Sequence, residues 1–462
     1  MKIKNITWSF MIALTAVGSG FTSCADQPDK FELASGTPTV YYIRPVDVAS
    51  KDSLVTSASL QSTICLVGDN LKSIKGILFN DQAAVLNTSY ITDHTLIVSV
   101  PNEIPSVVTD KMYMITASND TIPYDFQVTI SAPSVVSMSN EWAKAGEEVT
   151  ITGDYFLDYD NYPLEIKVGK DYTLPREAIT SIEKTKITFT MPEDMPQHED
   201  IVVSDKYGST NAPFQYMDNR GMLFDFDTPN SVTNEVLGNS GWHDRIIQSD
   251  DTSLSGNYMQ IGNTGVTMPA NGKWNDEFSF EYWAGNWANP ETYASHPRLC
   301  DVADFSDWTN KSLKFEMLIP ADAGWGAGPM QIIFGSPSQI SLGNAGVVDV
   351  NGVTLAGCNN TWFHAQNGWG RAIYMPWYSN SSASLYDTGD KWVTVTIPLS
   401  DFNLEFDGNS ATKSFSSIND FSSLNIFLIK GAYNDKSVLL TEWNVHQLSR
   451  LIIFVLCLIN KS

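Results

Sequence analysis

Tryptophan is concentrated in the second half of this 462-residue chain, which holds 13 tryptophans in all. A hydrophobic core uses few of them, because each ring is large and carries an N–H group that needs a partner. The surplus between residues 218 and 450 therefore predicts exposed rings, whose flat faces suit the alternately apolar and hydroxylated faces of a sugar chain. These tryptophans are Trp242, Trp274, Trp283, Trp287, Trp308, Trp325, Trp362, Trp369, Trp377, Trp392 and Trp443.

Three clusters of these rings lie among glycines and asparagines, which favour surface loops. An indole face covers the C–H face of a pyranose, and nearby amide, imidazole and guanidinium groups fix the orientation of the sugar. By analogy with base stacking, each such stack contributes about 1–3 kcal/mol. A core position is the alternative for each tryptophan of the clusters. The predicted carbohydrate-binding residues are Trp283, Trp287, Trp325, Trp362, His364, Gln366, Asn367, Trp369, Arg371, Trp377 and Tyr378.

The chain is strongly acidic, with 52 Asp and Glu against 28 Lys and Arg and a formal net charge of -24. This balance argues against nucleic acid as a partner, because phosphates require a basic surface. It also argues against docking on anionic lipid or on an acidic polysaccharide. A neutral ligand is favoured, and the alternative is that the acidity serves solubility alone.

The first residues have the organisation of a targeting segment. Two lysines precede an apolar stretch, residues 6–17, which is too short to span a bilayer as a helix. Residues 21–24, Phe-Thr-Ser-Cys, resemble a degenerate bacterial lipobox, which implies that Cys24 carries lipid. The acidic run 24–29 resembles the signal that sends Bacteroidetes lipoproteins to the cell surface. An ordinary secretory signal with an incidental cysteine is the alternative.

No cofactor or metal site is predicted. The five cysteines include no C-x-x-C pair, so zinc-site spacing is absent, and the chain has no P-loop or dinucleotide fingerprint. Cys65 lies in an apolar run and is predicted to be a core residue. The sequence leaves open a disulfide between Cys300 and Cys358, and it also leaves open a structural calcium ion.

Residues 37–217 contain an imperfect repeat with a period of roughly ninety residues. Residues 38–40 (Pro-Thr-Val) align with 133–135 (Pro-Ser-Val), and residues 68–71 (Gly-Asp-Asn-Leu) align with 153–156 (Gly-Asp-Tyr-Phe). The pattern resembles IPT/TIG domains, which are immunoglobulin-like sandwiches. The glycine of each Gly-Asp pattern is expected to allow a tight turn that a side chain would strain.

Alternating, strand-like runs broken by Gly, Pro, Asn and Asp recur along the chain, for example at residues 95–100 and 391–397. Trp308 precedes another such run, residues 313–317, and is predicted to be a core residue. Trp392 alternates with Val393 and Val395 and is predicted to be core or half-buried. The predicted fold is all-β: two immunoglobulin-like (IPT/TIG) sandwiches followed by a larger β-sandwich carbohydrate-binding domain. The predicted segments are a signal peptide 1–23, a linker 24–36, sandwiches 37–131 and 132–217, a large sandwich 218–450 and an atypical apolar tail 451–462.

The whole chain resembles the surface glycan-binding lipoproteins of Bacteroidetes polysaccharide utilisation loci, of the SusE-position type. Segments 305–316, 371–377 and 392–402 are the most specific to it. The resemblance implies a non-catalytic protein, lipid-anchored in the outer membrane at the cell surface, that holds a neutral β-glucan such as xyloglucan or mixed-linkage glucan. It also implies a TonB-dependent porin and its lipoprotein partner as neighbours. The chain departs from the family after Val445. The apolar run 451–459 suggests a frameshifted or mis-called end, and a buried last strand is the alternative.

Two other function classes stay open. A glycoside hydrolase, such as an endo-β-glucanase, needs two carboxylates that flank the scissile bond. The carboxylates near the aromatic clusters, Glu281, Glu291, Asp301 and Asp387, fall in no motif that indicates this role, and no G-x-S-x-G supports Ser/His/Asp chemistry. A protein-binding adhesin would account for the repeats but not for the tryptophans. The sequence does not distinguish xyloglucan, mixed-linkage glucan and mannan as ligands.

Overall fold

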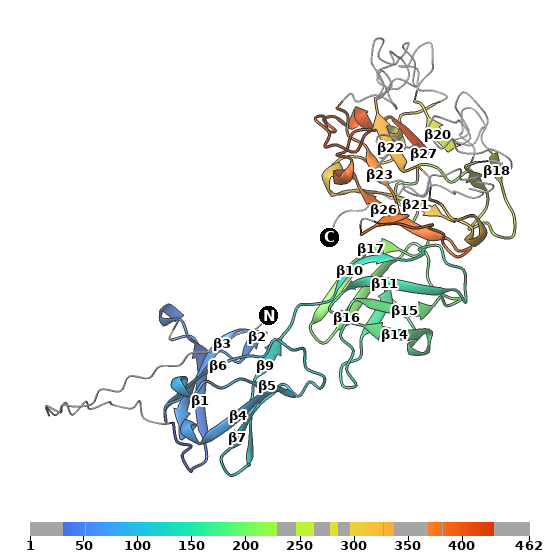
Figure 1. Ribbon diagram of the computed structural model, residues 1–462. Coiled ribbons are helices and arrows are strands. Elements are labelled where there is room, and N and C mark those ends of the chain that lie inside the picture. The colour runs from blue at the N-terminus through green and yellow to red at the C-terminus, as the bar shows by residue number, and fades with distance from the viewer. Residues whose placement is uncertain are drawn as a thin grey trace, which may run out of the picture. The chain divides into compact units, whose positions relative to one another are not determined.

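A computed structural model describes residues 31–50, 52–228, 246–262, 278–284, 296–326, 328–336, 368–380 and 382–428. The regular secondary structure of this part of the chain is mostly β-strand (Figure 1), as the sequence predicts. Among the described residues, no helix has both the length and the apolar character needed to cross a bilayer. The chain divides into two compact units, Met1–Ile130 and Ser131–Ser462.

The first unit holds one β-sandwich. One layer is the sheet β1-β3-β6, the other is β5-β4-β7-β8, and the short strands β2 and β9 pair in parallel. Side chains such as Leu66 of β3 and Met112 of β7 fill the core between the layers, and Cys65 is also buried. The elements are β1 (Thr39–Pro45), η1 (Val48–Ser50), β2 (Ser57–Ser59), β3 (Thr63–Asp69), η2 (Leu71–Ser73), β4 (Ile74–Phe79), β5 (Gln82–Ala84), η3 (Thr88–Tyr90), β6 (Thr95–Ser99), β7 (Lys111–Thr116), β8 (Thr121–Asp125) and β9 (Gln127–Thr129).

The second unit begins with a sandwich of the same design. Its layers are β10-β11-β15-β14 and β13-β12-β16-β17. Ile151 of β11 and Val203 of β16 are among the residues that form its core. The elements are β10 (Ser134–Met138), β11 (Glu148–Asp154), β12 (Glu165–Val168), β13 (Tyr172–Thr173), η4 (Arg176–Ala178), β14 (Ile179–Glu183), β15 (Lys186–Thr190), β16 (Asp200–Asp205) and β17 (Gly208–Gln215).

The repeated Gly-Asp pattern has the same backbone role in both sandwiches. Each glycine lies inside a strand, β3 or β11, opposite a β-bulge in the neighbouring strand. A Cβ on Gly68 would lie 1.9 Å from the Thr39 carbonyl oxygen, and a Cβ on Gly153 would lie 1.9 Å from the Ser134 carbonyl oxygen. The expectation of a tight turn at these glycines is therefore wrong. Glycine is required because the backbone of the adjacent strand approaches closely.

The third domain follows in the same unit. Its larger sheet, β20-β27-β22-β23, and the strand pair β21-β26 enclose the main core, and β18-β19 and β24-β25 are hairpins. The elements are β18 (Ile246–Gln248), β19 (Tyr258–Gln260), β20 (Ser279–Tyr282), α1 (Leu299–Val302), η6 (Trp308–Asn310), β21 (Ser312–Met317), η7 (Ala321–Ala323), β22 (Met330–Gly335), β23 (Ala372–Tyr374), β24 (Tyr378–Ser379), β25 (Ser382–Ala383), β26 (Val393–Pro398), η8 (Leu399–Asp401), η9 (Ile418–Phe421) and β27 (Ser423–Leu428).

Candidate functional site

The sheet β20-β27-β22-β23 carries different residues on its two faces. Strands β20 and β22 both pair antiparallel with β27, so residues opposite one another share a face. Ile426 and Ile332 are opposite each other and belong to the main core. The other face carries Glu281 and Asn425, which are opposite each other, and Gln331 of β22. These three polar side chains are 1% exposed or less, so their hydrogen bonds must be made inside the protein.

Trp283 lies one residue past β20, on the same face as Glu281 because side chains alternate along a strand. Its indole Nε1 donates to Asn425 Oδ1 at 2.9 Å. The ring is half-buried and packs against the cluster that contains Trp369. The other polar atom of the Asn425 amide, Nδ2, is buried and meets no acceptor among the described residues. One hydrogen-bond donor beside Trp283 is therefore unused.

A buried guanidinium completes this face. Arg371 Nη1 donates to Gln331 Oε1 at 2.9 Å, and the guanidinium carbon lies 5.6 Å from the centre of the Phe406 ring, within cation–π range. Gln331 Nε2 donates to the Phe406 carbonyl at 3.0 Å. We call these buried side chains the polar layer. The polar layer consists of Glu281, Gln331, Arg371 and Asn425.

The prediction of exposed rings at Trp325 and Trp377 is wrong. Both are 1% exposed or less and belong to the main core. Trp325 Nε1 donates to the Gly328 carbonyl at 3.1 Å, so the indole N–H has a hydrogen-bond acceptor inside the protein. Trp369 and Arg371 are buried as well, at 6% and 1% exposure, and neither is a surface platform.

The glycines beside these rings have a packing role. A Cβ on Gly370, next to Trp369, would lie 2.2 Å from the Phe402 carbonyl oxygen. A Cβ on Gly324, next to Trp325, would lie 3.3 Å from the Leu385 Cβ. Glycine at these positions lets neighbouring segments approach closely. The composition that favours surface loops therefore marks tight packing here.

Several described segments converge at the end of the sheet where Trp283 lies. The Ala284 N–H donates to Ser423 Oγ at 2.9 Å. Ser423 is opposite Gly335, the last residue of β22. Trp369, which precedes β23, donates from Nε1 to a carbonyl of β22 at 2.9 Å. The ends of β20 and β22, the start of β27 and the approach to β23 thus meet around Trp283.

Of the remaining predicted site residues, one lies in the described part of the chain and the others lie outside it. Tyr378 is half-buried on β24 and packs against the main core. Trp308, predicted to be a core residue, is only half-buried against the main core, whereas Trp392 is buried, as predicted. The predicted residues that lie outside the described part of the chain are Trp287, Trp362, His364, Gln366, Asn367 and the lipidation residue Cys24.

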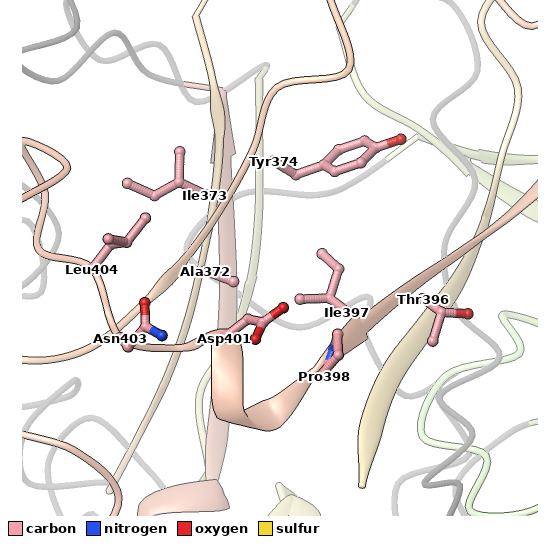
Figure 2. Close-up of a pocket in the computed structure, with 9 residues that line it drawn as sticks. All are labelled: Ala372, Ile373, Tyr374, Thr396, Ile397, Pro398, Asp401, Asn403 and Leu404. Carbon is pink, nitrogen blue, oxygen red and sulfur yellow. The ribbon is translucent and has the colours of Figure 1, made fainter. Parts of the chain in front are cut away.

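A separate cleft lies between β23 and β26 (Figure 2). Its volume is about 370 Å³, near the lower limit for a small-molecule site. Thr396, Asp401 and Asn403 contribute polar groups, and aliphatic side chains make up most of the rest. No residue of the polar layer and none of the predicted site residues lines this cleft.

Comparison with known proteins decides the family. Residues 216–445 match the surface glycan-binding protein B xyloglucan binding domain, and residues 133–216 match the IPT/TIG domain. The crystal structure of the surface glycan-binding protein PbSGBP-B from Prevotella bryantii is 93% identical, with a TM-score of 0.84. That match covers 93% of this chain and 100% of the other. The chain belongs to the surface glycan-binding protein B family.

Other relatives of this surface glycan-binding protein are more distant. An IPT/TIG domain-containing protein of Bacteroides ovatus is 27% identical over 193 residues, 39% of this chain and 38% of the relative, so the chain matches well under half of that protein. The SGBP-B of a complex xyloglucan utilisation locus in Bacteroides uniformis is 14% identical, covers 90% of this chain and 97% of that chain, and has a TM-score of 0.36. The family predicted from the sequence is confirmed by the Prevotella bryantii structure and the domain match.

Sequence analysis of this surface glycan-binding protein missed the centre of the polar layer. Asn425 lies in the run Ser-Leu-Asn-Ile-Phe-Leu of β27, and Gln331 lies in the run Met-Gln-Ile-Ile-Phe-Gly of β22. A lone amide in an otherwise apolar strand is costly to bury unless it is hydrogen-bonded. This mismatch between the amide and its apolar neighbours is the sequence signal that marks both positions.

The carboxylates weighed for a hydrolase have other partners or lie elsewhere. Asp301 accepts two hydrogen bonds from Arg298, both at 2.7 Å. Glu281 belongs to the buried polar layer, and Asp387 accepts from the Gly389 N–H at 2.9 Å. Glu291 and Cys358 lie outside the described residues. Within the described part of the chain, no three or more His, Cys, Asp or Glu side chains are grouped to hold a metal ion.

Proposed function

We propose that this surface glycan-binding protein captures a neutral plant β-glucan without cleaving it, with Trp283 at the centre of the contact. The carrying observation is the Trp283–Asn425 pair, in which a fully buried amide fixes an indole ring that remains partly exposed. The exposed part of such a fixed ring offers an apolar face on which a glucose unit can stack. The match of residues 216–445 to a xyloglucan binding domain supports a β-glucan as the ligand.

The charge of the chain supports a neutral polysaccharide. With a formal net charge of -24, the protein repels acidic glycans such as pectins at low salt. Recognition of a neutral chain relies on stacking and on amide or hydroxyl hydrogen bonds, which cost little when the ligand carries no charge. We place the rest of the contact at the predicted residues of the adjoining segments. Those residues are Trp287, Trp362, His364, Gln366 and Asn367.

Affinity electrophoresis of the full chain in gels that contain xyloglucan, mixed-linkage glucan or glucomannan tests this proposal. We expect retardation by xyloglucan or mixed-linkage glucan and no release of soluble oligosaccharides. Trp283→Ala is expected to weaken calorimetric affinity by about 1–3 kcal/mol, because one stack is lost. The matched control is Tyr41→Ala, since this exposed ring lies in the first sandwich. Equal affinity of both variants and the parent would contradict the assignment of Trp283.

Hydrolysis is the outcome that would overturn the non-catalytic part of the proposal. Release of oligosaccharides by the purified protein, abolished by Glu281→Gln or Asp301→Asn, would indicate a hydrolase instead. A chain that binds no polysaccharide but retains a partner protein would support the adhesin alternative.

We also propose a lipid anchor at Cys24 that holds the protein on the outer face of the outer membrane. The support is the lipobox-like segment 21–24 together with the family, whose members are surface proteins. Protease added to intact cells should digest the parent, and a Cys24→Ala protein should be absent from the surface. Protection of the parent from protease would place it in the periplasm. The resemblance to the SusE-position type favours a TonB-dependent porin and its lipoprotein partner as neighbours.

A further inference from the structure

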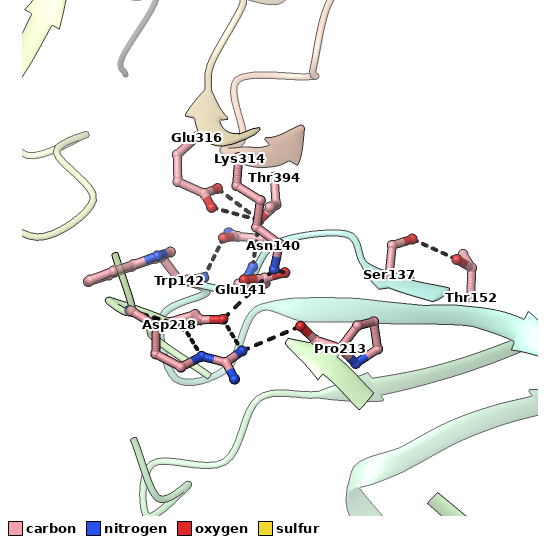
Figure 3. Close-up of polar contacts among 11 residues, drawn as sticks. Ser137, Asn140, Glu141, Trp142, Thr152, Pro213, Asp218, Lys314, Glu316 and Thr394 are labelled. Atoms are coloured by element: carbon pink, nitrogen blue, oxygen red, sulfur yellow. Dashed lines mark hydrogen bonds and ion pairs between the residues drawn. The ribbon is translucent and has the colours of Figure 1, made fainter. Parts of the chain in front are cut away.

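The outer face of β21-β26 is covered by the second sandwich. All six residues of β21 are buried, although Ser312, Lys314 and Glu316 alternate with core residues and would face water in an isolated sheet. The Thr394 N–H of β26 donates to the Ser139 carbonyl at 3.0 Å, across the boundary between the two domains. Figure 3 shows this contact region, which we call the joint. The joint consists of Ser139, Glu141, Asp218, Arg220, Lys314, Glu316 and Thr394.

Two ion pairs lie in the joint: Lys314–Glu141 is buried, whereas the Arg220 side chain of Arg220–Asp218 is 44% exposed. Lys314 Nζ donates to Glu141 Oε1 at 2.5 Å and lies 3.9 Å from Asp218 Oδ2. The Lys314, Glu141 and Asp218 side chains are 4%, 3% and 0% exposed. Arg220 donates to both carboxylate oxygens of Asp218, at 2.9 and 2.7 Å. Lys314 thus links strand β21 to Glu141 of the second sandwich and lies near Asp218, as Figure 3 shows.

Glu316 is a third carboxyl group in the same place. Its two oxygens lie 2.7 and 2.9 Å from Thr394 Oγ1, and that hydroxyl also accepts the Glu141 N–H at 2.9 Å. The charged groups that face it are Lys314 from its own strand and Glu141 from the second sandwich. Lys314 is already paired with Glu141. An ionised Glu316 would thus be an uncompensated charge inside the protein, which is strongly unfavourable.

The pKa values of the two glutamates differ in line with their partners. Burial, reinforced by the nearby Glu141 charge, raises the pKa of Glu316 from its ordinary value of 4.5 to about 8. Burial raises the pKa of Glu141 to about 7, although Lys314 opposes the shift. The carboxyl without a cation of its own is the one that holds its proton to higher pH.

We propose that the second sandwich is an integral part of the glycan-binding domain, joined to it by a cluster of ion-paired side chains around an uncharged Glu316, and that ionisation of Glu316 opens this joint. Ionised Glu316 would repel Glu141 across the domain boundary. Because the folded-state pKa of Glu316 is raised, its stabilising effect is complete below about pH 4.5 and is lost as the pH rises through about 8. The joint is therefore closed in mildly acidic solution and weakens in alkaline solution.

Hydrogen exchange of the full chain, followed at pH 6 and pH 9, tests the proposal. The reporters are the backbone N–H groups of Glu141 and Thr394, which both donate across the joint. Each measured exchange rate is divided by the intrinsic exchange rate of an unprotected N–H at the same pH. The ratio then reports how often the joint opens and not the direct effect of pH on exchange. We expect protection at both positions to fall at least tenfold from pH 6 to pH 9 in the parent. Glu316→Gln keeps the shape and the Thr394 contact without a titrating group, and it should keep its protection at pH 9.

Glu165→Gln is the matched control, because Glu165 is an exposed side chain on the second sandwich. It should show the same loss of protection as the parent. Thr394→Val removes the hydroxyl that accepts the Glu141 N–H, so this N–H should lose protection at both pH values. Thr394→Ser keeps the hydroxyl and should show the protection of the parent. Equal pH dependence in the parent and in Glu316→Gln would overturn the proposal. Full protection of both reporters at pH 9 in the parent would overturn it as well.

Discussion

The two faces of the sheet β20-β27-β22-β23 both have tryptophans beside them, but the indole N–H groups are held differently. On the core side, Trp325 donates to a backbone carbonyl, and Trp377 Nε1 is buried with no acceptor among the described residues. On the polar-layer side, Trp283 donates to the amide of Asn425. Trp369, on the same side, is buried and donates to the Phe334 carbonyl as a core ring does. Of these four rings, only that of Trp283 remains partly exposed. The number of tryptophans therefore does not by itself indicate how many rings a glycan could reach.

The largest expected effect concerns the core side. Trp325→Ala should lower the free energy of unfolding by about 3–5 kcal/mol, because it removes a fully buried ring and leaves a cavity. Urea unfolding followed by circular dichroism measures this loss, and Trp325→Phe should lose much less. A stable Trp325→Ala protein with reduced glycan affinity would show that this ring serves binding. The distinction between the core tryptophans and Trp283 would then be wrong.

The polar layer should respond next in size. Arg371→Met removes the donor to Gln331 Oε1 and leaves a buried acceptor unsatisfied, which costs about 1–3 kcal/mol of stability. The double variant Arg371→Met with Gln331→Met should lose less than the sum of the two single changes, because it removes both partners. Additive losses in this double-mutant cycle would mean that the two side chains do not act together.

A smaller effect is expected at the edge of the polar layer. Trp283→Phe keeps an aromatic face but removes the N–H that Asn425 Oδ1 accepts. We expect calorimetric affinity for the β-glucan to fall by about 0.5–1.5 kcal/mol, with a melting temperature close to that of the parent. A large fall in melting temperature at unchanged affinity would place Trp283 with the core tryptophans.

The smallest effect is expected in the cleft between β23 and β26. Asn403→Ala changes an exposed side chain that lines this cleft away from the polar layer. Affinity and stability should both stay within about 0.5 kcal/mol of the parent. Calorimetry under the conditions used for Trp283→Ala makes the two results comparable. A loss of affinity here would move the glycan site to the cleft.

Much of the fold was predictable because its signals are local. Alternation along residues 95–100 and 391–397 corresponds to strands β6 and β26. The repeated Gly-Asp pattern corresponds to equivalent strands in two sandwiches, although the role of the glycines was misjudged. Among the candidate site residues, the assignment of Trp325 and Trp377 to the surface failed, because the glycines that suggested loops mark close packing instead.

The sequence by itself determined the all-β class, the duplicated sandwich and the family, since periodicity, turn residues and motifs are properties of neighbouring positions. Only the tertiary structure decided which tryptophans are buried and what their N–H groups meet. Burial depends on strands that are distant in sequence, as in the bond from Trp283 to Asn425, 142 positions away. The joint has the same origin: Glu141 and Lys314 are 173 positions apart. No local pattern encodes such a pair, because its free energy arises only when folding excludes water from both charges.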